Sequence, residues 1–375
     1  MLAVYVSGHG YGHATRTAEV LRAVRERASA LKITICTSAP SFLFEGVVGP
    51  PLAVRVVECD VGLVQKDALT IDEAGTAEAV RQFLFGWDAL VSREARWLRE
   101  SGARLVLGDI PPLAFAAAAD AGVQSIALGN FSWDWIYSHL AARQPALAEA
   151  AAHAAQAYAR AGLLLRLPFA GDLSAFRRIE DVPLVARAPE LEKAEARRRL
   201  GLDARPVVLL SFGGVGIPGL EAAAFGRLDE YRFLLTGQAG DGTAPNVRRL
   251  EAGELSAAGL YYPDLVAAAD VVVSKPGYGI VTDCIGARTR LVYTDRGDFP
   301  EYPVLVSEMP RYLPVAFASN EDVREGRLDD ALRHVMTLPF PAPSPTNGAA
   351  VAADRVVAAL QAESRATSGD RRGAP

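Results

Sequence analysis

The stretch from Ser274 to Asp283 limits the folds open to this chain more than any other. It reads SKPGYGIVTD and follows VAAADVVV, an apolar run typical of a buried parallel strand, and the residues after it can continue as a helix. A strand, a glycine-rich turn and a helix start leave unpaired backbone N–H groups at the positive end of a helix dipole, which favours phosphate binding. Gly277 and Gly279 carry no Cβ, so the backbone can approach a ligand closely. The alternative is an ordinary turn with glycines for shape.

Asp283 is predicted to lie about one turn inside the helix that follows. Its carboxylate is placed to accept hydrogen bonds from a diol, as an acidic residue does on ribose in nucleotide sites. We therefore expect Asp283 to lie near the surface, and we expect its removal to change the stability of the fold little.

The beginning of the chain has the same order of strand, glycine turn and helix. Residues 2–6 form an apolar strand, residues 7–13 read SGHGYGH, and ATRTAEVLRAVRERAS has helical periodicity with Leu21 and Val24 facing inward. This order predicts the first unit of a doubly wound α/β sheet. The turn departs from the G-x-G-x-x-G fingerprint and no acid clearly ends the next strand, so a nicotinamide site is not indicated.

Two of the chain's five histidines, His9 and His13, lie in this first turn. The turn follows the carboxyl end of a strand, where open α/β sheets bind ligands. Histidine is the side chain best suited to proton transfer near neutral pH. We expect His13 to be the base because it opens the helix, and His9 to pack or contact substrate. The alternative is that both are structural or exposed.

Polar residues follow three later apolar segments. Asp109 ends the strand RLVLGD, where it can orient a histidine or cap the next helix. Asn130 ends VQSIALG and precedes Trp133, a residue type that lines sugar pockets or simply packs. Gln65 lies in a polar segment that is either a substrate-side loop or a plain surface loop.

The composition narrows the class of protein. Half of the residues are hydrophobic and the net charge is −5 with both signs interspersed, so we expect no nucleic-acid partner. Three widely spaced cysteines, Cys36, Cys59 and Cys284, predict neither a disulfide framework nor a zinc site. The first residues form a strand rather than a signal peptide, and no apolar run reaches the roughly 18 residues of a membrane span. We expect a cytoplasmic protein without a transmembrane segment; the sequence does not indicate an oligomeric state.

The second half of the chain repeats the architecture of the first. RPVVLLSF leads into the glycine loop 213–216, YRFLLTG and RLVYTD are further strands, and GLYYPDLVAAAD is predicted as a short strand and a helix. The predicted organisation is a domain at 1–165, a linker at 166–186, a domain at 187–345, a helix at 346–362 that crosses back to the first domain, and a disordered tail at 363–375.

The segments SFGGVG and YYPDLVAAADVVVSKPGYGIVTD resemble the donor half of the GT-B glycosyltransferases, and the resemblance covers nearly the whole chain. It implies two facing Rossmann-like domains with a cleft between them. The glycine loop of that family wraps a diphosphate, and the acid of the second motif holds the ribose, although many members have Glu where this chain has Asp283. An acidic or amide residue after the next strand holds the donor sugar, and Asp298 and Glu301 both occupy that region.

A closer resemblance is to the glycosyltransferase-like amino-terminal region of the L-arabinokinases, carried by SGHGYGHATRT, GLVQKDALT, GDIPPLAFAAAADAGVQSIALGNFSWDWIY and SKPGYGIVTDCI. Neither a P-loop nor a sugar-kinase domain is present in these residues, so we do not expect phosphotransferase activity. In plant-type transferases a histidine of the first loop pairs with an Asp after a later strand, and His13 and Asp109 match those positions.

The expected activity is metal-independent transfer of a sugar from a nucleotide diphosphate donor, a UDP-sugar in our expectation, to a small-molecule or other acceptor, with inversion and without a cofactor. A nucleotide-sugar epimerase, a hydrolase or a degenerate nucleotide-sugar-binding protein are the alternatives. The catalytic pair is His13 and Asp109. The donor-binding set is Gly213, Gly214, Gly216, Tyr262, Gly277, Tyr278, Gly279, Asp283, Asp298 and Glu301. The acceptor-side set is His9, Gly10, Tyr11, Gly12, Gln65, Asn130 and Trp133.

Overall fold

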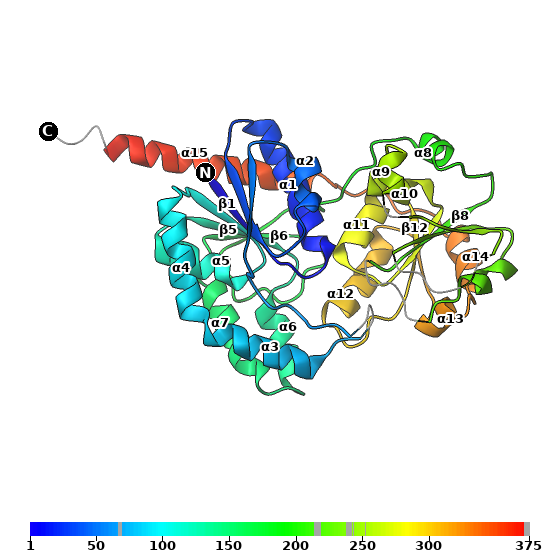
Figure 1. The fold of residues 1–375 in the computed structure, drawn as a ribbon, viewed down its shortest axis with the longest axis horizontal. Helices are drawn as coiled ribbons and strands as arrows, with labels where there is room; N and C mark the ends of the chain where they lie inside the picture. Colours follow the sequence, from blue (N-terminus) through cyan, green and yellow to red (C-terminus); the bar gives the residue numbers. More distant parts are fainter. Residues whose placement is uncertain (67–69, 214–218, 238–241, 243, 252, 371–375) are drawn as a thin grey trace. The chain divides into compact units, whose positions relative to one another are not determined.

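The computed structural model describes residues 1–66, 70–213, 219–237, 242, 244–251 and 253–370 (Figure 1). The chain forms two compact units. The first comprises Met1–Val64, Asp72–Val185 and Pro345–Pro375, and the second comprises Gln65–Ile71 and Ala186–Ser344. None of the helices in the described ranges is long and apolar enough to cross a membrane.

The first unit is built on a parallel sheet whose described strands follow the order β3-β2-β1-β4-β5-β6-β7. Every residue of β1, β4 and β5 is buried, as expected for apolar strands covered on both faces. The strands are β1 (Leu2–Val6), β2 (Ile33–Thr37), β3 (Leu52–Val56), β4 (Leu105–Asp109), β5 (Ser125–Gly129), β6 (Leu163–Arg166) and β7 (Ile179–Asp181).

Helices cover both faces of this sheet. Figure 1 shows α1 and α15 on one face and α4, α5 and α7 on the other. Leu21 and Val24 of α1 are fully buried, which confirms the predicted orientation of that helix. The helices of this unit are α1 (Tyr11–Arg27), α2 (Phe42–Val48), α3 (Glu73–Phe85), α4 (Trp87–Glu100), α5 (Pro112–Ala121), α6 (Trp133–Ala141), α7 (Leu147–Tyr158) and α15 (Gly348–Asp370).

The carboxyl-terminal helix α15 packs against α1 at the other end of the sequence. Its buried residues include Val356 and Leu360, and Asp354 accepts a hydrogen bond from Arg27 at 2.5 Å. The helix continues to Asp370, whereas we expected a disordered tail at 363–375; residues 371–375 lie outside the described residues. Alanine, glutamate and arginine in this stretch are good helix formers, which is consistent with the continuation.

The segment 166–186 is more than the expected linker. It contains β7, which pairs with β6, and the first unit extends to Val185. Prolines and dense charge suggested a connection there, but backbone pairing at the edge of a sheet does not require apolar side chains.

The second unit is built on a parallel sheet with the order β10-β9-β8-β11-β12-β13 among its described strands. Its core contains apolar residues of β8, β9 and β11 together with Phe212, Phe225 and Leu332. The strands are β8 (Val207–Ser211), β9 (Arg232–Thr236), β10 (Val247–Arg249), β11 (Val271–Ser274), β12 (Arg290–Tyr293) and β13 (Val315–Phe317).

The helices of the second unit include one that begins where the sequence suggested a strand. The residues directly before α10 form no strand. Instead, Pro263 in the first turn and a capping box between Tyr261 and Asp264 start the helix. The helices are α8 (Lys193–Arg199), α9 (Glu254–Ala257), α10 (Tyr262–Ala268), α11 (Tyr278–Ala287), α12 (Glu301–Glu308), α13 (Asn320–Arg324) and α14 (Asp329–Thr337), with 3-10 turns η1 (Ala222–Arg227) and η2 (Met309–Arg311).

Candidate active site

Both glycine turns lie at the points where strand order reverses in their sheets. In the first unit this point is between β1 and β4, and in the second it is between β8 and β11. Loops at the carboxyl ends of such neighbouring strands form the ligand-binding crevice of open α/β sheets. The register places Val6 beside Asp109, and the backbone N–H of Ser7 donates to the Asp109 carbonyl at 2.9 Å.

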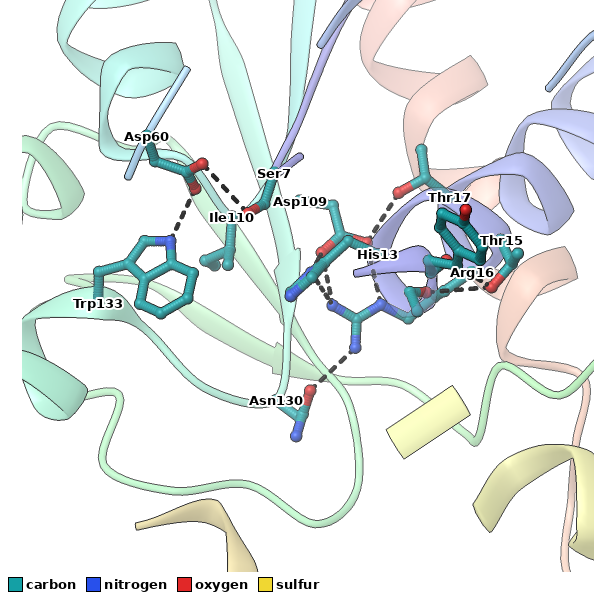
Figure 2. A network of polar contacts seen from close by, with 12 residues as sticks. Ser7, His13, Thr15, Arg16, Thr17, Asp60, Asp109, Ile110, Asn130 and Trp133 are labelled. Atoms are coloured by element: carbon teal, nitrogen blue, oxygen red, sulfur yellow. Dashed lines mark hydrogen bonds and ion pairs between the residues drawn. The ribbon is translucent and has the colours of Figure 1, made fainter. Parts of the chain in front are cut away.

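The first unit brings His13 and Asp109 together, as Figure 2 shows. His13 Nδ1 lies 2.8 Å from Asp109 Oδ1. The other carboxylate oxygen, Oδ2, accepts hydrogen bonds from Arg16 Nε at 2.9 Å and from the Thr17 hydroxyl at 2.7 Å. Arg16 also donates to Asn130 Oδ1 at 2.9 Å. These five residues therefore form one buried polar network, which we call the Asp109 network.

Asp109 carries a charge in this network although it is fully buried. Burial raises the pKa of a carboxyl group, but the positive charge of Arg16 and the contact with His13 outweigh that effect and hold the pKa of Asp109 below its usual value. The carboxylate thus has a permanent counter-ion, Arg16, in addition to the histidine.

Arg16 and Thr17 were missed in the sequence. They lie three and four residues after His13 on α1, which is the spacing that places side chains on the same face of a helix. That spacing was the available signal, and it went unused because an arginine in the first turns of a helix ordinarily faces solvent.

A second polar cluster lies beside the first in Figure 2 and is centred on Asp60. Asp60 is 5% exposed; its carboxylate accepts hydrogen bonds from Ser7 Oγ at 3.2 Å and from the Trp133 indole N–H at 2.8 Å. The Nε2 atom of His9 lies 3.3 Å from the Asp60 carbonyl oxygen and 3.5 Å from its Oδ1. Asp60 follows β3 in a loop without any motif, so only the fold reveals that it meets the first glycine turn.

An aromatic series connects the two clusters. Phe131 contacts both His13 and Trp133, with ring centroids 5.4 and 5.2 Å away, and Trp133 stacks on Tyr137 at 5.8 Å. A small cavity of about 30 Å³ lies against Trp133 and Tyr137, with Asp60 also in its wall. Trp133 is itself only 3% exposed, so its ring is packed among its neighbours in this region.

The remaining acceptor-side residues differ in exposure. Gly10, Tyr11, Gly12 and Gln65 are exposed, and Tyr11 packs edge-on against exposed Phe42 with ring centroids 6.3 Å apart. Asn130 is fully buried as part of the Asp109 network.

In the second unit, the described donor-side residues lie around the carboxyl ends of β8 and β11. Gly213 follows β8 with a φ of 74°, a conformation that favours glycine, while Gly214 and Gly216 lie outside the described residues. Gly277 precedes α11, and Tyr278 and Gly279 form its first turn. The Ser274 hydroxyl donates to the Ser211 carbonyl at 2.5 Å and so joins the two strand ends.

Tyr262 is the first residue of α10, and its hydroxyl forms a 2.5 Å hydrogen bond with the hydroxyl of Ser211 at the end of β8. Burial raises the pKa of Tyr262 to about 12, so its phenol is neutral at physiological pH. It can therefore fix the end of β8 as a neutral hydroxyl.

The expected surface location of Asp283 is wrong. Asp283 is 1% exposed, and both of its carboxylate oxygens accept hydrogen bonds from Arg187, which was not foreseen. Burial disfavours the charged guanidinium, but Asp283 outweighs this and holds the pKa of Arg187 above its usual value. The Arg187 guanidinium also lies over the rings of Tyr261 and Tyr262. A role for Asp283 at a ribose stays a prediction.

Asp298 and Glu301, the two sugar-binding candidates, differ in their surroundings. Asp298 is exposed, whereas Glu301 is buried and accepts a hydrogen bond from Arg296 at 2.7 Å. Arg296 also donates to the Pro276 carbonyl at 3.0 Å and thereby connects the loop after β12 with the turn before α11. Among the described residues, no group of three or more His, Cys, Asp or Glu side chains is placed to hold a metal ion.

The two parallel sheets define the fold of the GT-B glycosyltransferases. The structure of the glycotransferase of kitacinnamycin aligns over 100% of this chain and 99% of its own, with a TM-score of 0.58 and 16% identity. UGT89C1 of Arabidopsis thaliana complexed with UDP-L-rhamnose aligns over 96% of this chain and 98% of its own, with a TM-score of 0.62 and 12% identity. The glycosyltransferase VinC in complex with dTDP aligns over 96% and 95%, with a TM-score of 0.55 and 13% identity.

In sequence, the chain is similar to L-arabinokinase of Arabidopsis thaliana, with 34% identity over 317 residues. The match covers 83% of this chain and 30% of that relative, so the chain spans about a third of the relative's length. No protein-family model matches the sequence.

Proposed function

We propose that this protein is an inverting glycosyltransferase that moves a sugar from a nucleotide diphosphate, a UDP-sugar, to an acceptor hydroxyl. The observation that carries the proposal is that the glycine turn at the point of strand reversal in a GT-B amino-terminal sheet has two histidines, each beside a buried aspartate: His13 Nδ1 lies 2.8 Å from Asp109 Oδ1, and His9 Nε2 lies 3.5 Å from Asp60 Oδ1. The sequence assigns His13 as base and Asp109 as its supporting acid.

In the proposed reaction a histidine of the first glycine turn takes the proton of the acceptor hydroxyl. The acceptor oxygen forms a bond to the anomeric carbon as the bond to the diphosphate oxygen breaks, and direct displacement inverts the configuration. The departing diphosphate needs positive partners, which the Gly213 turn and the amino terminus of α11 would supply through backbone N–H groups without a metal.

The structures with UDP-L-rhamnose and with dTDP among the fold relatives support a nucleotide-sugar donor in general. The choice of UDP rests on the resemblance of the second glycine motif. The experiment must identify the donor sugar and the acceptor.

The experiment is a panel of nucleotide sugars incubated with the protein, with and without candidate acceptors, in which free nucleotide and products are measured. Release of nucleotide only with an acceptor supports transfer. Release without an acceptor indicates a hydrolase, a changed donor sugar indicates an epimerase, and binding without turnover indicates a nucleotide-sugar-binding protein. A glycoside product with retained anomeric configuration would contradict direct displacement.

A further inference from the structure

Each of the two histidines in the first glycine turn lies beside a buried aspartate. The two histidine–aspartate pairs differ in whether the aspartate also has an arginine as a counter-ion. His13 faces Asp109, whose charge Arg16 already neutralises, whereas His9 faces Asp60. Within the described part of the chain, no arginine or lysine forms an ion pair with Asp60, and its carboxylate accepts hydrogen bonds from the neutral donors Ser7 and Trp133.

The two pairs therefore contain different numbers of positive groups. A protonated His13 would lie against a carboxylate that has its own cation, and Arg16 Nη2 is 3.1 Å from His13 Nδ1, so two positive charges would share one buried acid. A protonated His9 would supply the single positive charge that the buried Asp60 carboxylate lacks.

The contacts of His9 also leave its Nδ1 atom available to accept a proton. Nε2 faces Asp60, and Nδ1 has no protein partner among the described residues. The His9 side chain is 35% exposed against 11% for His13, so His9 can reach a substrate more easily. Gly62 leaves room for the ring, because a Cβ on that residue would lie 2.2 Å from the His9 ring. Trp133 contacts the same ring edge-on.

We propose that His9, oriented by Asp60, is the group that accepts the acceptor proton, and that His13 is a positioning residue within the Asp109 network. This inference rests on the proposed sugar transfer. The proton moves from the acceptor hydroxyl to His9 Nδ1 while Nε2–H donates to Asp60, and the released electron pair forms the glycosidic bond as the diphosphate departs.

The kinetic test compares His9→Ala, His13→Ala and a control, His334→Ala, whose side chain is exposed on α14. His9→Ala should lower turnover by roughly 10²–10⁴-fold with unchanged UDP affinity, as expected for a positioned base. His13→Ala should lower it by less than about tenfold. A large loss in His13→Ala with near-normal His9→Ala overturns the inference, as does near-normal turnover in both.

A second measurement reads the tautomer of His9 and decides the case in which both variants lose activity. Long-range proton–nitrogen NMR spectra of ¹⁵N-labelled protein at about pH 8.5 show which ring nitrogen carries the proton in each neutral histidine. We expect the His9 proton on Nε2 in the wild type and also in Asp60→Asn, because that variant keeps the backbone carbonyl that faces Nε2, while the loss of the carboxylate charge should still lower turnover. A His9 proton on Nδ1, or normal turnover of Asp60→Asn, overturns the pair.

These outcomes separate the two proposals. Absence of transfer in the wild-type panel refutes the proposed function, and the tautomer spectra then judge the His9–Asp60 pair alone. Transfer by the wild type with a normal His9→Ala variant refutes only the present inference.

Discussion

Asp109 is fully buried and binds His13, Arg16 and Thr17 at once. Its replacement therefore removes more than a partner of a histidine, because it leaves the buried guanidinium of Arg16 without a counter-ion. A loss of activity in such a variant would combine a chemical and a structural effect.

We predict that Asp109→Asn lowers the free energy of unfolding by about 3–5 kcal/mol, the usual cost of removing one partner of a buried ion pair. Urea unfolding measures this change. Asp298→Asn is the matched control, since Asp298 is exposed. Equal stability of the two variants would show that Arg16 finds another partner.

The Asp109 network also predicts how the stability of the protein changes at acidic pH. The folded-state pKa of Asp109 is lowered, so its contribution to stability is complete above the ordinary carboxyl pKa of 3.8 and is lost as the pH falls through the lower folded value. Asp109→Asn should therefore flatten the decrease in stability below about pH 4. An unchanged acid limb of the stability curve would argue against a charged Asp109.

Asp283 offers a second residue-scale prediction. Asp283→Ala should destabilise the protein by about 3–5 kcal/mol because it leaves the guanidinium of Arg187, whose side chain is only 11% exposed, without its counter-ion. A double variant, Arg187→Met with Asp283→Leu, should recover much of that loss because neither charge remains buried alone. Thermal unfolding of the three proteins provides the measurement, and a double variant no more stable than Asp283→Ala would contradict the charge argument.

At the scale of elements, the sequence predicted the long apolar strands well. The runs that became β1, β4, β8 and β11 are buried along their whole length, so hydrophobic patterning alone identifies them. The strands β7, β10 and β13 have only three residues each, and β7 and β10 are mostly polar. Their pairing depends on backbone hydrogen bonds, which leave no periodic signal.

The residues of the candidate site also divide into those that the sequence indicated and those that it did not. His9, His13 and Asp109 were visible because they follow apolar strands in glycine- or proline-rich contexts. Asp60 and Arg187 could not be found in this way, since tertiary structure alone brings Asp60 to the first glycine turn and Arg187 to Asp283.

The contact between α1 and α15 also leads to a prediction. Leu360→Ala in α15 should destabilise the first unit by about 2–5 kcal/mol, the usual cost of truncating a buried leucine. All four tryptophans, Trp87, Trp97, Trp133 and Trp135, lie in the first unit, so their fluorescence follows its unfolding. Ala358→Ser at an exposed position of the same helix is the control, and an equal effect of both changes would show that α15 adds little stability.

At the scale of the whole molecule, the repeated order of strand, glycine turn and helix predicted two doubly wound parallel sheets, and the topology confirms them. The boundaries of the two units were harder to predict, because the first unit takes residues from both ends of the chain. The helix expected at 346–362 was predicted to cross back to the first domain, and α15 does pack against α1.

Metal independence is a prediction for the whole enzyme. Turnover should persist in EDTA, because backbone N–H groups and helix termini would carry the diphosphate charge in the proposed mechanism. Steady-state rates with EDTA, and with magnesium or manganese added back, provide the measurement. A strict loss in EDTA that either ion restores would require a different account of the leaving group.

The discontinuous composition of the first unit has a consequence for biosynthesis. A ribosome makes β1 and α1 before the second unit and α15 after it, so the face of α1 that α15 covers stays exposed while the second unit is being made. Native packing of the first unit must therefore wait until α15 has been made, and a nascent chain halted before residue 345 should be more sensitive to protease in its amino-terminal half than a chain that includes α15.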